Sequence, residues 1–195
     1  MKRLDLVVGP NGAGKSTFVE LTLGPLLPRS PFVNADVIAR QRWPDDPVGH
    51  SYDAALVAAD TRDRLITIGR SFIAETVFSH PSKLDLIRTA RSSGFVVMLH
   101  VVLIPEDLAV ERVRHRVLSG GHDVPVNKIR DRYRRLWELV VTAINSTDTA
   151  TAYDNSRIRG PRVVAQFSGG AVIGAPTWPS WTPGPLVRRW PRDAG

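Results

Sequence analysis

The sequence contains no cysteine and no long apolar run, and these two absences exclude several classes of protein. Without cysteine there is no disulfide framework, no zinc-thiolate site and no cysteine nucleophile. The longest apolar stretch, Phe95 to Pro105, is interrupted by His100 and is far shorter than the roughly 20 residues that span a bilayer. The first residues, MKRLDLVVGPNGAGKS, lack the apolar segment and the cleavage site of a secretory leader. We therefore expect a cytoplasmic protein that does not enter a membrane.

Lysine is also scarce, and this weakens the significance of the positive charge. The chain has 26 Lys and Arg residues against 19 Asp and Glu, a net charge of +7, but only 4 of the 26 are Lys. A high-GC genome raises the arginine content by itself, so the basic balance is weak support for nucleic-acid binding. The sequence also lacks aromatic residues interleaved on a basic strand. Nucleic acid is therefore disfavoured as a partner, whereas small polyanionic ligands fit the charge.

The chain alternates between short apolar runs and longer helical patterns, which predicts an α/β fold. Expected strands lie at Leu4–Val8, Phe32–Val33, Phe72–Glu75, Phe95–Leu103 and Thr151–Asp154, each but the last followed by a helix. The run at 95–103 is the most continuous, as in a central parallel strand covered on both faces. A further helix is expected between Trp43 and Gly69, and another from about Val126. The pattern predicts a mostly parallel sheet flanked by helices.

The C-terminal part of the chain differs from this pattern. Arg162–Phe167 and Ala171–Ile173, separated by Ser168-Gly169-Gly170, predict a hairpin. The last 20 residues hold 5 of the 15 Pro and 3 of the 5 Trp, which predicts that they form neither a helix nor a central strand. We therefore expect one domain over residues 1–175 and a Pro/Trp-rich tail over residues 176–195 that packs back on the domain or on a partner.

A phosphate-binding loop is the clearest motif. Gly9-Pro10-Asn11-Gly12-Ala13-Gly14-Lys15-Ser16 fits G-x-x-x-x-G-K-[ST] and lies between a buried strand and a helix, as the motif requires. Such a loop directs backbone N–H groups at one phosphate, its lysine reaches the β- and γ-phosphates, and its serine holds Mg²⁺. The sequence therefore predicts that ATP and Mg²⁺ bind here. The expected nucleotide contacts are Gly9, Asn11, Gly12, Ala13, Gly14, Lys15, Ser16 and Thr17, with Ser16 as the metal ligand.

Polar residues follow two of the expected strands at the edge where the phosphate loop lies. Asn34-Ala35-Asp36 follows the second strand, and Glu75-Thr76 ends the third. Asp36 can serve as the base that accepts a proton from an acceptor hydroxyl, or it can cap the next helix. Glu75 suits a substrate hydroxyl or the water shell of Mg²⁺, or it is a solvated strand end. We expect Asn34, Asp36, Glu75 and Thr76 to contact the acceptor.

Arginines further along the chain are expected to form a helical lid. Arg112 and Arg116 share one polar face of a helix, followed by the Gly-rich loop around His122 and then by a second basic helix that contains Arg132. In phosphoryl-transfer enzymes such a lid brings arginine to the transferring group. The alternative is an ordinary solvated basic face. His122 is a further candidate for substrate contact.

Taken in order, GPNGAGKSTF, FVNAD, ETVFSH, RVRHRVLSGGHDVP, RDRY and YDNS resemble the zeta-toxin family of P-loop kinases, especially its short members. The resemblance covers Leu4 to Ser156 and implies a P-loop kinase fold. It implies Lys15 and Ser16 at ATP and Mg²⁺, Asp36 as base, Glu75 with Thr76 at the acceptor, and Arg116 with Arg112 or Arg132 as lid arginines. It also implies that Asn155 borders the nucleotide base. Zeta toxins phosphorylate the sugar of UDP-N-acetylglucosamine and are restrained by small antitoxins, so a sugar-nucleotide acceptor and a small antitoxin are the implied substrate and partner.

Three other functions remain open at this level. A detoxifying or metabolic kinase for an antibiotic or a simple sugar would share the loop, the aspartate and the lid. An ATP-dependent nucleic-acid module would explain the charge, and its binding would weaken steeply with salt. A regulatory nucleotide-binding protein without turnover would need the loop alone. We expect an ATP-dependent phosphotransferase that acts on a hydroxyl of a small molecule.

Overall fold

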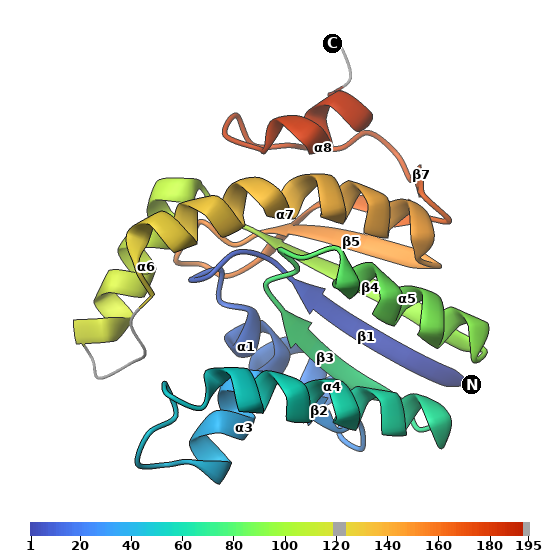
Figure 1. Cartoon of the computed structure of the whole chain (residues 1–195). Helices are drawn as coiled ribbons and strands as arrows, with labels where there is room; N and C mark the ends of the chain where they lie inside the picture. The colour runs from blue at the N-terminus through green and yellow to red at the C-terminus, as the bar shows by residue number, and fades with distance from the viewer. Residues whose placement is uncertain (119–123, 193–195) are drawn as a thin grey trace.

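The computed structural model describes residues 1–118 and 124–192 of the 195-residue chain. A seven-stranded sheet in the order β2-β3-β1-β4-β5-β6-β7 forms its centre (Figure 1). Its strands are β1 (Lys2–Val8), β2 (Phe32–Val33), β3 (Phe72–Thr76), β4 (Phe95–Leu103), β5 (Thr149–Asp154), β6 (Arg162–Ser168) and β7 (Ala171–Val172). The first five are parallel, and β6 and β7 form an antiparallel hairpin beside β5. This confirms the predicted α/β class, the mostly parallel sheet and the C-terminal hairpin.

Helices cover both faces of the sheet (Figure 1). They are α1 (Lys15–Phe18), a π-helical turn η1 (Val19–Leu23), α2 (Gly24–Leu26), α3 (Ala35–Arg42), α4 (Ser51–Thr67), α5 (Ser82–Ser92), α6 (Glu106–Leu118), α7 (Val126–Ser146) and α8 (Gly184–Arg189). The helix predicted between Trp43 and Gly69 is α4, which packs against α3. The two helices of the predicted lid are α6 and α7, which pack against each other. None of the helices in the described ranges is long and apolar enough to cross a membrane.

The register of the parallel strands decides what lies at the edge that carries the phosphate loop. Val8 at the end of β1 pairs with Thr76 at the end of β3, and Val7 pairs with Glu75. On the other side of β1, Val8 pairs with Val101 of β4. Because the loop after β1 and the last residues of β3 share one edge, the motif and the acidic strand end predicted from sequence lie side by side.

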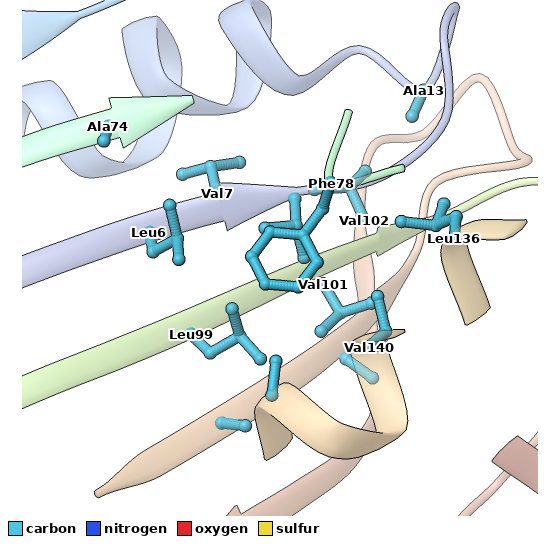
Figure 2. Packing of buried hydrophobic residues seen from close by; sticks show 14 of the residues in the cluster. Leu6, Val7, Ala13, Ala74, Phe78, Leu99, Val101, Val102, Leu136 and Val140 are labelled. Carbon is cyan, nitrogen blue, oxygen red and sulfur yellow. The ribbon is translucent and has the colours of Figure 1, made fainter. Parts of the chain in front are cut away.

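The apolar core on one face of the sheet is built mainly by β1, β4 and α7. Leu6 and Leu99 point from the strands toward Leu136 and Val140 of α7, and Phe78 lies between them (Figure 2). The buried positions of α7 recur at helical spacing, which explains why this segment forms one long amphipathic helix. Burying such side chains contributes roughly 1.5–3 kcal/mol each. The core therefore fixes the strand ends that carry the candidate site.

A polar network is buried on the opposite face. Asp5 of β1 and His100 of β4 are 1% and 6% exposed, and Asp5 Oδ1 lies 2.9 Å from His100 Nε2. Arg3 donates two hydrogen bonds of 2.6 Å to the Asp5 carboxylate. Burial raises the pKa of Asp5, but hydrogen bonds from His100 and Arg3 outweigh burial and leave that pKa below its ordinary value. Phe18 of α1 packs on the His100 ring and covers this network.

The expectation that the last 20 residues form no helix is wrong, because residues 184–189 form α8. Pro185 stands in its first turn, where the missing N–H would be unpaired in any helix, so proline does not prevent this one. Trp178 and Trp190 are both buried and lie against Phe167 of β6, and the Trp178 indole donates to the Trp190 carbonyl. The segment thus packs back on the domain, over α7 and the outer strands (Figure 1).

Candidate active site

A cleft of about 600 Å³ opens at the carboxyl edge of the sheet. Its wall collects residues from the phosphate loop, the ends of β2 and β3, and helices α3 to α7. Among its lining residues are many of those predicted from sequence: Asn11, Gly12, Gly14, Lys15, Ser16, Thr17, Asn34, Asp36, Glu75, Thr76, Arg112, Arg116 and Arg132. The side chain of His122 was also predicted to contribute, but His122 lies outside the described residues.

The phosphate loop has the backbone that its glycines permit. Gly12 has a φ of +75°, and a Cβ there would lie 2.8 Å from the carbonyl oxygen of Ala109 in α6. Gly9 approaches β4 so closely that a Cβ would lie 2.4 Å from the Val102 carbonyl oxygen. Neither position tolerates a side chain without a shift of backbone. The loop is therefore held tightly between the end of β4 and the start of α6.

Lys15 is buried at the base of the cleft, with 7% of its side chain exposed. Its Nζ donates a 3.0 Å hydrogen bond to the carbonyl of Pro10 and lies 3.8 Å from Glu75 Oε1. Burial lowers the pKa of the Lys15 ammonium, and the negative charges of Glu75 and Asp36 act against that shift. Lys15 is thus within electrostatic reach of both predicted carboxylates and pairs with Glu75.

Glu75 is bound into the phosphate loop. Its Oε2 accepts a 2.8 Å hydrogen bond from the Ser16 hydroxyl and a 2.6 Å bond from Asn34 Nδ2. A hydroxyl and a carboxylate oxygen placed together beside a phosphate site are suitable ligands for Mg²⁺, because this ion is held by one or two carboxylates plus phosphate oxygens. Of the two roles open for Glu75, the geometry favours the metal and its water shell over direct contact with an acceptor.

Asp36 has a different environment. The cap of α3 is Asn34, whose Oδ1 accepts hydrogen bonds from the backbone N–H groups of Asp36 (2.7 Å) and Val37 (3.2 Å). Helix capping, the alternative role for Asp36, therefore belongs to the neighbouring residue. The Asp36 carboxylate is exposed in the cleft and forms no hydrogen bond or ion pair with any described side chain. Its negative charge acts on Lys15.

Thr76 and Phe78 form a strained turn after β3. Phe78 has a φ of 64°, a left-handed conformation that is rare for an aromatic residue, and its N–H donates to the Thr76 hydroxyl at 3.3 Å. The Phe78 ring is buried in the core (Figure 2), which holds the turn in this conformation. Strain of this kind is concentrated at binding sites. Thr76 thus shapes the floor of the cleft as well as lining it.

The structure brings the three arginines predicted for the lid to one cleft. Arg112 and Arg116 of α6 and Arg132 of α7 line the cleft. Arg130, on the same helix as Arg132, instead pairs with Glu106 and Asp107 of α6, at 3.1 and 2.7 Å. The resemblance placed Asn155 at the nucleotide base; here its Nδ2 donates a 2.8 Å hydrogen bond to the Ala13 carbonyl and braces the loop from below.

Several cleft residues were missed by sequence reasoning. They are Arg40 of α3, Ala55, Ala58 and Arg62 of α4, Val77, Phe78 and Ser79 between β3 and α5, and Lys83 in the first turn of α5. The three cations stand singly on helices and belong to no motif. The scarcity of lysine was the one signal that could have drawn attention to Lys83, which is one of four in the chain.

The family model described as an AAA domain matches residues 4–139, more than half of the chain. The chain therefore belongs to this family of P-loop domains, and its fold is that of the P-loop kinases. No curated protein matches the chain.

Among solved structures, the AvrRxo1-ORF1:AvrRxo1-ORF2 complex with sulphate ions contains a chain that aligns with a TM-score of 0.71 and 15% identity, over 98% of this chain and 64% of that one. The same complex with ATP gives a TM-score of 0.68 and 16% identity, again over 98% and 64%. A chain of the PezAT chromosomal toxin-antitoxin system of Streptococcus pneumoniae aligns with a TM-score of 0.61 and 16% identity, over 83% of this chain and 70% of that one. This chain thus spans 64% of the first of these relatives, and at such identities the likeness concerns the fold.

Proposed function

We propose that the protein is an ATP-dependent kinase that transfers the γ-phosphoryl group of ATP to a hydroxyl of a small molecule, with a sugar nucleotide such as UDP-N-acetylglucosamine as the first candidate acceptor. One observation carries the proposal. Of the two carboxylates at the phosphate loop, Glu75 is bonded to Ser16 and Asn34, whereas Asp36 is exposed in the cleft without a bonded partner in the described part of the chain. Glu75 is therefore suited to hold the metal, and Asp36 is suited to accept a proton from the acceptor.

In the proposed reaction the phosphate loop and Lys15 hold the triphosphate. Ser16 and Glu75 would hold Mg²⁺, which when bound neutralises charge on the β- and γ-phosphates. Asp36 accepts the proton of the acceptor hydroxyl as its oxygen forms a bond to the γ-phosphorus, and the bond to the β-phosphate oxygen breaks to release ADP. Arg112, Arg116 and Arg132 stabilise negative charge on the phosphoryl group during transfer.

The comparisons support this proposal at the level of the fold, and one neighbour was crystallised with ATP. They also motivate the proposed partner. PezAT is described as a toxin-antitoxin system, and AvrRxo1-ORF1 forms a complex with AvrRxo1-ORF2. We include a small antitoxin among the proposed partners of this chain. The sugar-nucleotide acceptor rests on the resemblance in sequence described above.

Mass spectrometry of a reaction mixture identifies the acceptor. The protein with Mg-ATP and a set of metabolites that includes UDP-N-acetylglucosamine is expected to add one phosphoryl group, about 80 Da, to that sugar nucleotide. A mass gain on an antibiotic or a simple sugar instead would show that the acceptor is a different molecule, and the proposed kinase activity would stand. ADP formation without any phosphorylated acceptor, or no ATP consumption at all, would contradict the proposed function.

A further inference from the structure

Besides the exposed Arg40 of α3, two half-buried cations line the cleft away from the lid arginines. Arg62 belongs to α4 and Lys83 to the first turn of α5, and both side chains line the cleft half-buried. These helices follow β2 and β3 in the chain; Asp36 lies just after β2, in α3, and Glu75 lies in β3. Arg112, Arg116 and Arg132 come instead from helices that follow β4, on the far side of the phosphate loop. Arg62 and Lys83 therefore lie on the acceptor half of the cleft.

The ion pairs of α4 and α5 set these two residues apart. Arg64 pairs with Asp60 at 3.0 Å, Arg88 pairs with Asp85, and Arg91 pairs with Asp148 at 3.3 Å. Every cation of these two helices that faces outward thus has a carboxylate partner. Within the described residues, the side chains of Arg62 and Lys83 form no hydrogen bond or ion pair.

The positive charges of Arg62 and Lys83 act against each other. Burial lowers the pKa of Arg62, and only the charge of the adjacent, exposed Asp63 acts against it. Burial also lowers the pKa of Lys83, and the positive charge of Arg62 lowers it further. Two like charges held close together at a partly buried surface repel each other, and an anion between them would remove that cost.

We propose that Arg62 and Lys83 form a second anion site that binds a diphosphate group of the acceptor while Asp36 receives its hydroxyl. The two positive charges match a nucleoside diphosphate ester, which carries about two negative charges, better than they match a single carboxylate. Arginine also presents a planar fork to phosphate oxygens, and lysine adds a point charge. This inference rests on the proposed function for the identity of the acceptor half, and it deepens that function by naming a specificity-determining pair.

The site can be tested without phosphoryl transfer. The phosphate loop is first saturated with Mg-AMPPNP, a non-hydrolysable ATP analogue, and inorganic pyrophosphate is then titrated in by calorimetry. Wild-type protein is expected to bind pyrophosphate with one site. Arg62→Ala and Lys83→Ala are each expected to weaken this binding by roughly tenfold or more, as the loss of one charge-assisted contact implies.

Matched controls come from the same two helices. Arg64→Ala in α4 and Arg88→Ala in α5 remove an outward-facing cation of similar charge, and we expect pyrophosphate affinity within about twofold of wild type for both. Acetate in place of pyrophosphate is expected to bind far more weakly. Equal losses in the cleft variants and the controls, equal affinity for acetate, or no pyrophosphate binding with the loop occupied would each overturn the proposal. A protein that binds pyrophosphate in this way but phosphorylates nothing would contradict the kinase and leave the anion site standing.

Discussion

The Ser16 hydroxyl donates a 2.8 Å hydrogen bond to Glu75 Oε2, and this contact joins the phosphate loop to the end of the neighbouring strand. The two residues are 59 positions apart and meet because β1 and β3 are adjacent parallel strands in register. The contact places a carboxylate where the metal of a P-loop enzyme is held. In the proposed mechanism this contact leaves the role of base to Asp36.

Glu75→Gln is therefore expected to change the dependence on metal. The amide keeps the size of the side chain but removes the charge, so the Mg²⁺ concentration for half-maximal activity should rise by about tenfold or more. A magnesium titration of phosphoryl transfer measures this. Glu20→Gln, on the exposed surface of η1, is the matched control and should titrate like wild type. An unchanged magnesium profile in Glu75→Gln would remove Glu75 from the metal site.

Lys15→Ala is expected to abolish ATP-dependent activity and leave the fold intact. The ammonium supplies charge to the phosphates, and its interactions are with Pro10 and Glu75 at the cleft rather than with the apolar core. Nucleotide binding by calorimetry and the thermal midpoint by circular dichroism separate the two effects. Turnover equal to that of wild type would contradict the kinase assignment.

Arg116→Ala should lower the rate of phosphoryl transfer far more than it raises the Michaelis constant for ATP. An arginine that acts on the transferring group stabilises charge chiefly in the transition state. Arg114 stands two positions away on the same helix, outside the cleft and in a separate hollow between α6 and α7, and is the matched control. Small and equal effects of Arg114→Ala and Arg116→Ala would indicate a solvated basic face.

Asp5→Asn should destabilise the protein in a manner that depends on pH. Because its folded pKa is lowered, Asp5 contributes stability above its unfolded pKa of about 3.9, and this contribution is lost as pH falls through the folded value. Replacing it weakens a buried ion-paired network, at a cost of about 2–4 kcal/mol near neutral pH. Denaturant unfolding from pH 7 to pH 3 is expected to show a shallower acid loss in the variant. Parallel pH curves for the two proteins would contradict this role of Asp5.

The sequence was sufficient for the parts of the site that depend on local motif and strand order. The spacing from Gly9 to Ser16 and the polar residues after two apolar runs predicted which strand ends meet, because parallel strands bring such ends to one edge. The sequence did not distinguish the roles of Asn34 and Asp36, since both residue types cap helices and backbone geometry decides which of the two does so. The structure assigns the cap to Asn34.

Tertiary contacts account for most of what sequence reasoning missed. Arg62 and Lys83 lie 21 positions apart on separate helices, so no spacing rule connects them, and their shared cleft appears only in three dimensions. The α8 helix was excluded on proline content, yet its segment is held by Trp178 and Trp190, whose burial favours one conformation of the chain. In both cases packing decided what local preference left open.

The most direct test of the account compares Asp36→Asn with wild type in two measurements made on the same samples, ATP affinity and the single-turnover rate of phosphoryl transfer. If Asp36 accepts the proton while Lys15, Ser16 and Glu75 hold the nucleotide, the variant keeps ATP affinity within about twofold and loses transfer by roughly 10² to 10⁴-fold, the usual contribution of a positioned base. A fall in ATP affinity as large as the fall in rate, or a rate equal to that of wild type, would contradict the division of roles between the two carboxylates.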